Sequence, residues 1–365
     1  MHDFEWCSRR KGRLSTVKPF RASLLLALVV PLGFGLAQRA STSKSAPPAA
    51  SAAVTARVVA AATAFLATLS DAERTKATFD FTSSQRTGWS NLPTGIFQRN
   101  GLKFGDMTAS QQQSALALVA AVLSRTGYQK VLNIVNADQR LEETSAPTRP
   151  ATSRTRFGRA EYYLAILGTP FPTDRWMLQF GGHHLAINVT VVGPDNVMTP
   201  SLPATQPARY VLNGQTIRPL GNENDKGFAL INALDAAQQK QAILDYKVSD
   251  LVLGPGAEGK VIQPEGILAS ALNARQQSLV LDVVHEWVGI LNDDAAAAKM
   301  AEVKANLPRT YFAWSGSTTN GGVAYYRIQG PTLVIEYAPQ QGDVDHIHTI
   351  YRDPTNDYGA RLVKP

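Results

Sequence analysis

An internal repeat is the sequence feature that most constrains the fold, because two copies of one segment favour the same secondary structure. Residues 69–81 align with residues 234–246 at an offset of 165 residues. The same offset aligns a set of later positions, which are Gly101, Ala109, Gln111, Gln112, Leu116 and Val119 with Gly266, Ala274, Gln276, Gln277, Leu281 and Val284. Apolar residues recur at helical spacing in these stretches, and Thr108 and Asn273 stand where an N-cap is expected. Both copies are therefore predicted to contain matching helices.

Strand-like segments follow the helices at a different offset. Residues 163–168 align with 311–316, and residues 182–188 align with 330–336, both at an offset of 148. These segments alternate in polarity and end in glycine or proline, which is typical of strands. The smaller offset implies an insertion in the first copy, for which the polar segment 143–158 is the candidate.

Helices followed by strands predict the α+β class with mainly antiparallel pairing. We expect two copies of a module with helices first and three strands after them, related by a pseudo-twofold axis. The first copy and its connecting loop cover residues 56–221, and the second copy with a C-terminal histidine segment covers 222–365. The pattern leaves open whether the two sheets join.

The N-terminus resembles a bacterial export signal. A basic stretch precedes the apolar run 22–33, and Gly35 and Ala37 fit the −3 and −1 positions of a cleavage site. The run is short and contains Pro31, so a membrane span is not expected after cleavage, although an uncleaved anchor is the alternative. We expect a signal peptide at 1–37, a flexible spacer at 38–55, and a periplasmic or secreted protein. The export route, general or twin-arginine, stays open.

Composition excludes several classes of function. The single cysteine, Cys7, lies in the signal, so the mature chain has no disulfide and no thiolate metal site. Much of the formal charge of +7 comes from the N-terminal segment, and no basic stripe with interspersed aromatic residues follows it, which argues against nucleic-acid binding. Gly-x-Ser-x-Gly and His-Glu-x-x-His motifs are also missing from the sequence.

Four of the six histidines occur in two close pairs. His183 and His184 follow Gly182, where an extended chain would place His184 and Asn188 on a polar face and His183 on an apolar one. The second copy has Pro331 and Thr332 at these positions, so the module does not require histidines there. A buried His183 bonded to a backbone carbonyl is the structural alternative. His285 lies in a helical pattern and is expected to be an interior or boundary residue.

The second pair, His346 and His348, points to one side of an extended segment, with Cα atoms about 7 Å apart. Two such imidazoles can chelate one divalent transition metal ion of the zinc or copper type. His184 is the predicted third ligand, and His183 is the second choice. Asp345, Asp353 and Arg352 are the candidate catalytic residues nearby, while an Arg352–Asp353 ion pair is the alternative for the last two.

Several segments together resemble a known family. They are residues 89–93 (Trp-Ser-Asn-Leu-Pro), Gly101-Leu102, residues 176–185 with the His-His pair, and residues 346–359. The chain is similar over nearly all of its length after the spacer to bacterial exported proteins with the uncharacterised DUF3500 domain. The resemblance implies export and one continuous unit, and it implies no substrate.

The leading interpretation is an exported metal-binding protein, with a metal-dependent hydrolase as its enzymatic version. Arg86 and Trp89 could line a ligand pocket with Asn188 and Arg352, or Arg86 and Trp89 could simply pack a loop. One alternative is a metal-free protein that binds an extracellular small molecule between the two copies. Another is an interaction protein whose partner is an envelope component.

Overall fold

The computed structural model describes residues 49–362. In it, the helices that contain Gln111-Gln112 and Gln276-Gln277 begin at the predicted N-caps. Thr108 caps α3 (Ala109–Val122), and Asn273 caps α7 (Ala274–Val288). Each cap side chain accepts a hydrogen bond from the backbone N–H of the glutamine three residues on, whose side chain accepts one from the backbone N–H of the cap residue. These reciprocal bonds satisfy donors that a helix start leaves unpaired, so they fix where both helices begin.

The remaining helices are α1 (Ala49–Ala67), α2 (Asp71–Ala77), α4 (Arg125–Ser145), α5 (Gly221–Asn232), α6 (Ala236–Ala242) and α8 (Asp293–Asn306). The predicted signal peptide lies outside the described residues. Helix α1 begins inside the segment 38–55, so the part of that segment from Ala49 onwards is helical rather than a flexible spacer. Within residues 49–362, no helix combines the length and apolar character needed to cross a bilayer.

Twelve strands form one sheet in the order β1-β3-β4-β5-β7-β14-β13-β12-β11-β10, with β2 on β3 and β6 on β5. Their bounds are β1 (Thr78–Phe79), β2 (Leu102–Lys103), β3 (Tyr163–Leu167), β4 (Arg175–Gly182), β5 (Leu185–Val192), β6 (Asp195–Val197), β7 (Leu202–Thr205), β10 (Ile267–Leu268), β11 (Tyr311–Gly316), β12 (Ala324–Gly330), β13 (Leu333–Pro339) and β14 (Ile347–Arg352). A separate hairpin consists of β8 (Tyr210–Leu212) and β9 (Gln215–Ile217). Pairing within the large sheet is antiparallel apart from β1 on β3. The predicted α+β class with a mainly antiparallel sheet is confirmed.

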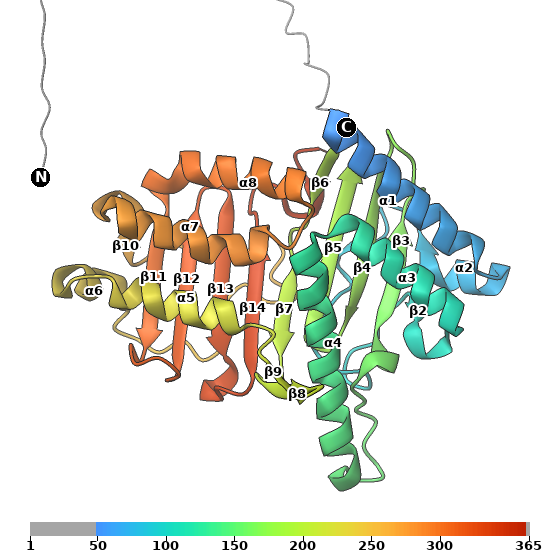
Figure 1. Cartoon of the computed structure of the whole chain (residues 1–365), viewed down its shortest axis with the longest axis horizontal. Coiled ribbons are helices and arrows are strands. Elements are labelled where there is room, and N and C mark those ends of the chain that lie inside the picture. Colours follow the sequence, from blue (N-terminus) through green and yellow to red (C-terminus); the bar gives the residue numbers. More distant parts are fainter. Residues whose placement is uncertain (1–48, 363–365) are drawn as a thin grey trace, which may run out of the picture. The chain divides into compact units, whose positions relative to one another are not determined.

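Strand β7 joins the two halves into this single sheet, which answers the question that the sequence left open. It pairs antiparallel with β5 on one side and with β14 on the other. Strands β5 and β14 therefore run in the same direction, and their first residues lie at the same end of the sheet (Figure 1).

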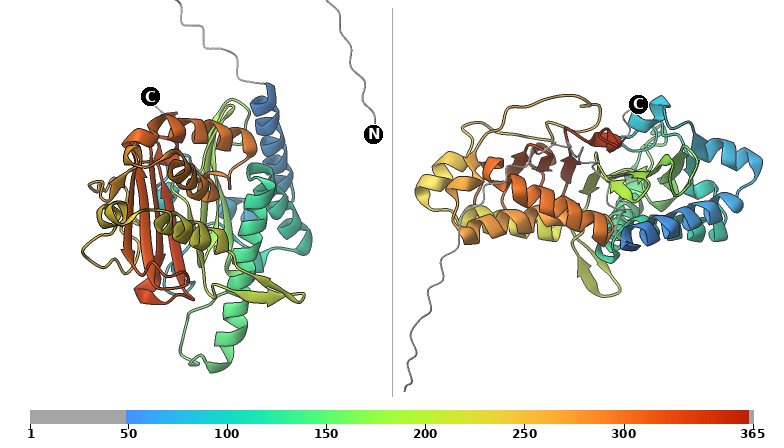
Figure 2. Two further views of the ribbon diagram at one scale, coloured as in Figure 1. Left: turned by 60° about the vertical axis from the view of Figure 1, so that its left-hand side comes forward. Right: turned by 90° about the horizontal axis from the view of Figure 1, so that it is seen from above.

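The helices cover one face of the sheet, and two long loops, 80–101 and 244–266, lie over the other (Figures 1 and 2). The main core fills the space between helices and sheet and includes Phe65, Leu118, Trp287 and Trp314. A smaller core lies under the loops, where Trp89 and Leu251 join residues such as Ile350 and Ala204 of the sheet. The face of the sheet under these two loops, called the loop face below, is therefore also buried by packed side chains.

Matching hydrogen bonds occur in the two predicted copies. The side-chain amide of Gln111 donates to the Thr68 carbonyl at 3.1 Å, and that of Gln276 donates to the Ala233 carbonyl at 2.8 Å. Helices α2 and α6, and strands β2 and β10, follow the predicted offset of 165. Duplication of the module stays a prediction, and these matched bonds support it.

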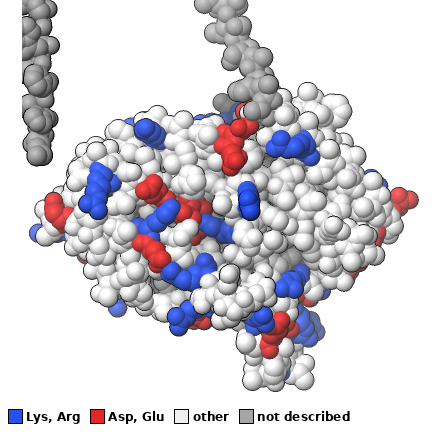
Figure 3. Space-filling view, in the orientation of Figure 1, with Lys and Arg blue, Asp and Glu red and all other residues white. Residues whose placement is uncertain are grey.

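One buried charged cluster joins a helix of the first half to two helices of the second half. Lys130 of α4 contacts Glu223 of α5 at 2.5 Å and Glu286 of α7 at 3.1 Å, and the Glu223 side chain is fully buried. Burial raises the pKa of Glu223, against the attraction of Lys130. Charged side chains of both signs gather on the surface over α5 and α7 (Figure 3). At the offset of 165, Glu223 and Glu286 correspond to Val58 and Ala121.

Replacing the cluster as a whole should cost much less than breaking it. Lys130→Met leaves a buried carboxylate unpaired, and we expect the free energy of unfolding to fall by about 3 kcal/mol. The triple variant Lys130→Met/Glu223→Leu/Glu286→Leu replaces the three side chains with apolar ones of similar volume and should stay within about 1 kcal/mol of the wild type. Urea denaturation measures both.

The control is Arg140→Ala, which breaks an exposed pair with Glu143 and should change stability by less than about 1 kcal/mol. A triple variant that loses as much stability as Lys130→Met would contradict the expectation.

Candidate metal centre

His183 and His184 form the two-residue turn between β4 and β5, and this corrects the prediction that they lie in an extended strand. The register pairs Gly182 with Leu185, so the two histidines are left to close the hairpin. His184 has a φ of 61°, a left-handed conformation that costs a non-glycine residue about 1 kcal/mol. The hairpin of the second copy closes with Pro331 and Thr332, neither of which has a positive φ. The strained turn is therefore specific to the histidine pair.

His346 lies just before β14 and His348 is its second residue, beside the same bridging strand. His348 is opposite Ala204 of β7, and the backbone N–H of Ala204 donates to the carbonyl of His184 at 2.8 Å. Strand β7 therefore holds the histidine turn and the start of β14 together.

Three imidazoles from these segments converge on one point. The Nε2 atom of His346 lies 2.8 Å from Nε2 of His184 and 3.1 Å from Nε2 of His348. One ligand atom from each residue lies within 4.8 Å of the others. Tetrahedral zinc with bonds of 2.0–2.1 Å separates its nitrogen ligands by about 3.3 Å. The predicted ligands His184, His346 and His348 are thus close enough to share one ion.

Asp250, in the loop 244–266, orients one of the three rings. Its Oδ1 atom lies 2.9 Å from Nδ1 of His348 and also accepts the backbone N–H of Leu251 at 2.7 Å. We assign the His348 proton to Nδ1, because that nitrogen faces a carboxylate, and Nε2 then carries a free lone pair. Burial alone would raise the pKa of Asp250, but the hydrogen bond and charge of His348 outweigh it and lower that pKa.

The other two rings are held in their neutral form. His184 is 1% exposed, and burial together with the neighbouring imidazoles lowers its pKa well below the usual value. Burial and the charge of His348 lower the pKa of His346 to about 4. Neutral imidazole is the form that ligates a metal ion.

A buried carboxylate lies behind the histidine turn. Asp138 of α4 contacts Nδ1 of His183 at 2.6 Å, and its Oδ1 is 3.6 Å from Nδ1 of His184. Burial raises the pKa of Asp138, against the attraction of His183. Nδ1 of His184 and Oδ2 of Asp138 are both buried without a hydrogen-bond partner in the described structure. His183, the second-choice ligand, thus contacts Asp138. Asp138, His183 and His184 form a second group in which one ligand atom from each residue lies within 4.8 Å of the others.

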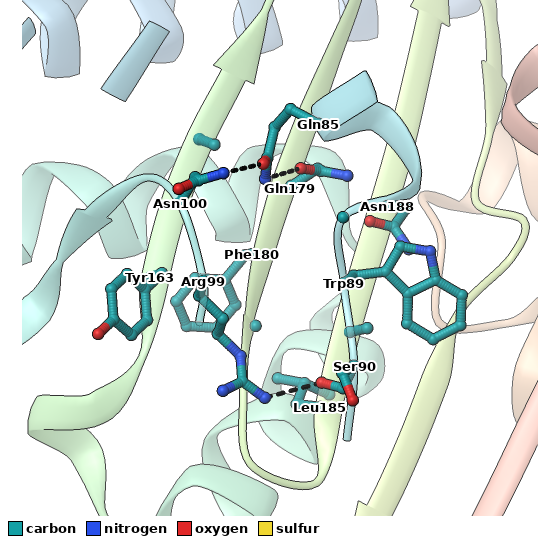
Figure 4. Close-up of a pocket in the computed structure, with 14 residues that line it drawn as sticks. Gln85, Trp89, Ser90, Arg99, Asn100, Tyr163, Gln179, Phe180, Leu185 and Asn188 are labelled. Carbon is teal, nitrogen blue, oxygen red and sulfur yellow. Dashed lines mark hydrogen bonds between the residues drawn. The ribbon is translucent and has the colours of Figure 1, made fainter. Parts of the chain in front are cut away.

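The group formed by His184, His346 and His348 is called the histidine cluster below. The loop 80–101 reaches it through Asn91, whose Nδ2 atom lies 3.4 Å from Nε2 of His348. Arg99 fixes this part of the loop. Its guanidinium is buried and donates from Nη2 to the carbonyls of Ser90 and Leu92 and, at 2.7 Å, to that of Gly182 at the end of β4 (Figure 4). Asn91 is therefore held against the histidine turn by backbone contacts of Arg99.

A cavity of about 310 Å³ opens beside the cluster on the loop face. Its walls contain His348, Asn91, Asp250 and Lys260, and most of the remaining wall is the segment 251–257. This volume is at the lower end of the range for small-molecule sites.

The model of the family described as "Protein of unknown function (DUF3500)" matches residues 51–360. The chain belongs to the DUF3500 family. The matched range includes the three histidines and both loops that reach them. Neither a comparison with curated proteins nor one with solved structures finds a match.

The predicted catalytic candidates of the DUF3500 chain lie in other contacts. Arg352 is buried, donates to the carbonyls of Leu253 and Gly254, and pairs with Asp357 at 2.9 Å, so it supports the cavity wall from behind. Asp353 pairs with Lys299 at 2.6 Å rather than with Arg352, and Asp345 accepts the backbone N–H of Ala208 at 2.9 Å. Within the described residues, neither carboxylate bonds to His184, His346 or His348.

Two of the three predicted ligand-binding residues of the first half line a second, smaller cavity. Trp89 and Asn188 line a space of about 30 Å³, which has room for water rather than for a substrate (Figure 4). Trp89 donates to the Tyr358 hydroxyl at 2.8 Å, and Asn188 donates to the Pro200 carbonyl at 2.9 Å. The guanidinium of Arg86 lies over the Phe81 ring at 5.6 Å. The contacts of Trp89 and Arg86 agree with the loop-packing alternative.

Sequence reasoning missed Asn91, Arg99, Asp138 and Asp250. Asn91 lies in the Trp-Ser-Asn-Leu-Pro stretch that carries the family resemblance, so it could have been proposed. The other three have ordinary local patterns, and only the fold brings them to the cluster.

Removal of the Arg99 guanidinium should loosen the Asn91 segment. Arg99→Met leaves three backbone carbonyls without their donor, and we expect a loss of about 3 kcal/mol in the free energy of unfolding. Hydrogen exchange of the amides in residues 88–93 should also become faster. Arg154→Met, at an exposed arginine, is the control and should change neither quantity by a comparable amount. Equal effects of the two variants would show that Arg99 does not hold the loop.

Proposed function

We propose that this DUF3500 chain binds one divalent transition metal ion through Nε2 of His184, His346 and His348, and uses it to hydrolyse a small molecule. The observation that carries the proposal is the convergence of three imidazole nitrogens from two distant segments on one point.

A metal ion resolves a conflict that hydrogen bonds alone leave in place. One proton can form a hydrogen bond between Nε2 of His184 and Nε2 of His346. His346 also faces Nε2 of His348, and we assigned the His348 proton to Nδ1, which faces Asp250. A cation accepts the lone pairs of all three rings at once. Asp250 faces the ring nitrogen of His348 opposite the ion, and Asp138 lies near that of His184, as carboxylates commonly do around metal-bound histidines.

An ion held by three imidazoles has an open coordination position, where it lowers the pKa of a bound water and polarises a substrate oxygen. The residues of this chain supply the rest of the site. Asp250 and Asn91 line the adjacent cavity, and Asp250 replaces Asp345 and Asp353 as the carboxylate nearest to an incoming substrate. The left-handed backbone of His184 is consistent with a conformation kept for function.

Metal content is the first test. Protein purified without a polyhistidine tag should contain about one metal ion per chain by mass spectrometry. His346→Ala/His348→Ala should lose it, because two of three ligands are gone. His285→Ala is the matched control, since it removes an exposed histidine of α7 outside the cluster. Protein with almost no metal, and with a melting temperature unchanged by Zn²⁺ or Cu²⁺, would overturn the proposal.

Asp250→Asn should weaken metal binding without abolishing it. The variant keeps a side chain of the same shape but loses the charge that orients His348, and such changes reduce affinity roughly 10–100-fold. Competition with a chromophoric chelator measures the dissociation constant. Asp245→Asn, at an exposed position in the same loop, should leave the affinity unchanged. An Asp250→Asn affinity equal to the wild type would remove Asp250 from the site.

The second candidate function is metal-free binding of an extracellular small molecule. The cavity beside His348 favours it, because both long loops contribute to its wall. A stoichiometric metal ion that is lost in His346→Ala/His348→Ala would support metal-dependent hydrolysis over metal-free binding.

We propose further that the protein is exported to the periplasm or beyond. The basic and apolar N-terminal segment and the absence of cysteine after it support this location. A fusion of residues 1–55 to an alkaline phosphatase that lacks its own signal should be active outside the cytoplasm. An inactive fusion that accumulates in the cytoplasm would contradict export.

A further inference from the structure

The histidine cluster is closed on one side and open on the other. His184 is almost fully buried, and Asp138 and His183 lie behind it. His348 is also buried, at 3% exposed, but it forms part of the wall of the 310 Å³ cavity. This cavity therefore offers a route by which a ligand could reach an ion at the cluster.

Two side chains of the cavity offer N–H donors, and they lie in different loops. Asn91 places its Nδ2 atom 3.4 Å from the Nε2 atom of His348, directly beside the proposed ion. Lys260 lines the same cavity and donates from Nζ to the carbonyl of Val252 at 3.2 Å. Within residues 49–362, no carboxylate forms an ion pair with Lys260, and Asp250 lines the same cavity.

Asp250 is the carboxylate in the lining of this cavity, and its Oδ1 atom is bonded to Nδ1 of His348. Most of the remaining wall consists of the small and apolar residues between Leu251 and Ala257. An ammonium group, an amide N–H and a metal cation together are a donor set that suits a negatively charged oxygen.

We infer that the cavity binds a small oxyanion, either a carboxylate or a phosphate group, with one oxygen directed to the ion and with Asn91 and Lys260 as donors. This inference rests on the proposed metal site and deepens it, because it names the class of substrate. The volume of the cavity limits that substrate to a small molecule. Lys260 acts as a specificity residue, and Asn91 positions the bound oxygen.

The test uses the full mature chain reconstituted with Co²⁺, whose visible absorption reports on its ligands. Acetate and inorganic phosphate are titrated separately as the two probes. We expect at least one of them to change the spectrum saturably. Lys260→Met and Asn91→Ala should each raise the dissociation constant of that probe about tenfold or more, with the cobalt stoichiometry unchanged. Lys247→Met, an exposed lysine of the same loop that does not line the cavity, is the control and should bind as the wild type does.

The outcomes separate the two proposals. Failure to bind cobalt would overturn the metal function, and this inference with it. Stoichiometric cobalt with no spectral response to either anion would overturn the inference alone. The same conclusion would follow if Lys260→Met bound the anion as tightly as Lys247→Met. Tighter binding of phosphate would support a phosphate-bearing substrate, and tighter binding of acetate would support a carboxylate.

Discussion

The register of strand β7 pairs two of its residues with β5 and two with β14, and Ser201 beside it bridges to Tyr351 of β14. These pairs make one sheet out of two half-sheets. Because β7 is antiparallel to both neighbours, β5 and β14 begin at the same end, where the turn before β5 carries His183 and His184 and the start of β14 carries His348. Ala204 of β7 lies opposite His348 and donates its N–H to the carbonyl of His184. The candidate site exists because this short strand fixes two distant chain segments side by side.

The two predicted copies contribute unequally to that site. Each has a hairpin in the equivalent place, but one closes with His183 and His184 and the other with Pro331 and Thr332. The long loops also differ in what they bring, since one supplies Asn91 and the other supplies Asp250. The shared architecture provides a frame, and residues outside the matched pattern provide the chemistry.

Local patterns predicted the frame because the interactions that form it are local. Thr108 and Asn273 cap their helices through bonds to residues three positions away, so the sequence shows both partners. The prediction for His183 and His184 was wrong for a related reason. Alternating polarity suggested a strand, whereas the pairing of Gly182 with Leu185 across the hairpin turned the two histidines into its tip. A register between strands depends on contacts that a local pattern does not contain.

The sequence by itself determined where α3 and α7 begin, the strands β3 and β11, the α+β class and the three histidines with ligand chemistry. Only the tertiary structure decided that these histidines meet, and that Asp250, Asp138 and Asn91 surround them while Asp345 and Asp353 bond elsewhere. The physical reason is chain distance. His184 and His346 are separated by 162 residues, and their contact depends on how the sheet closes at β7 rather than on any property of either segment.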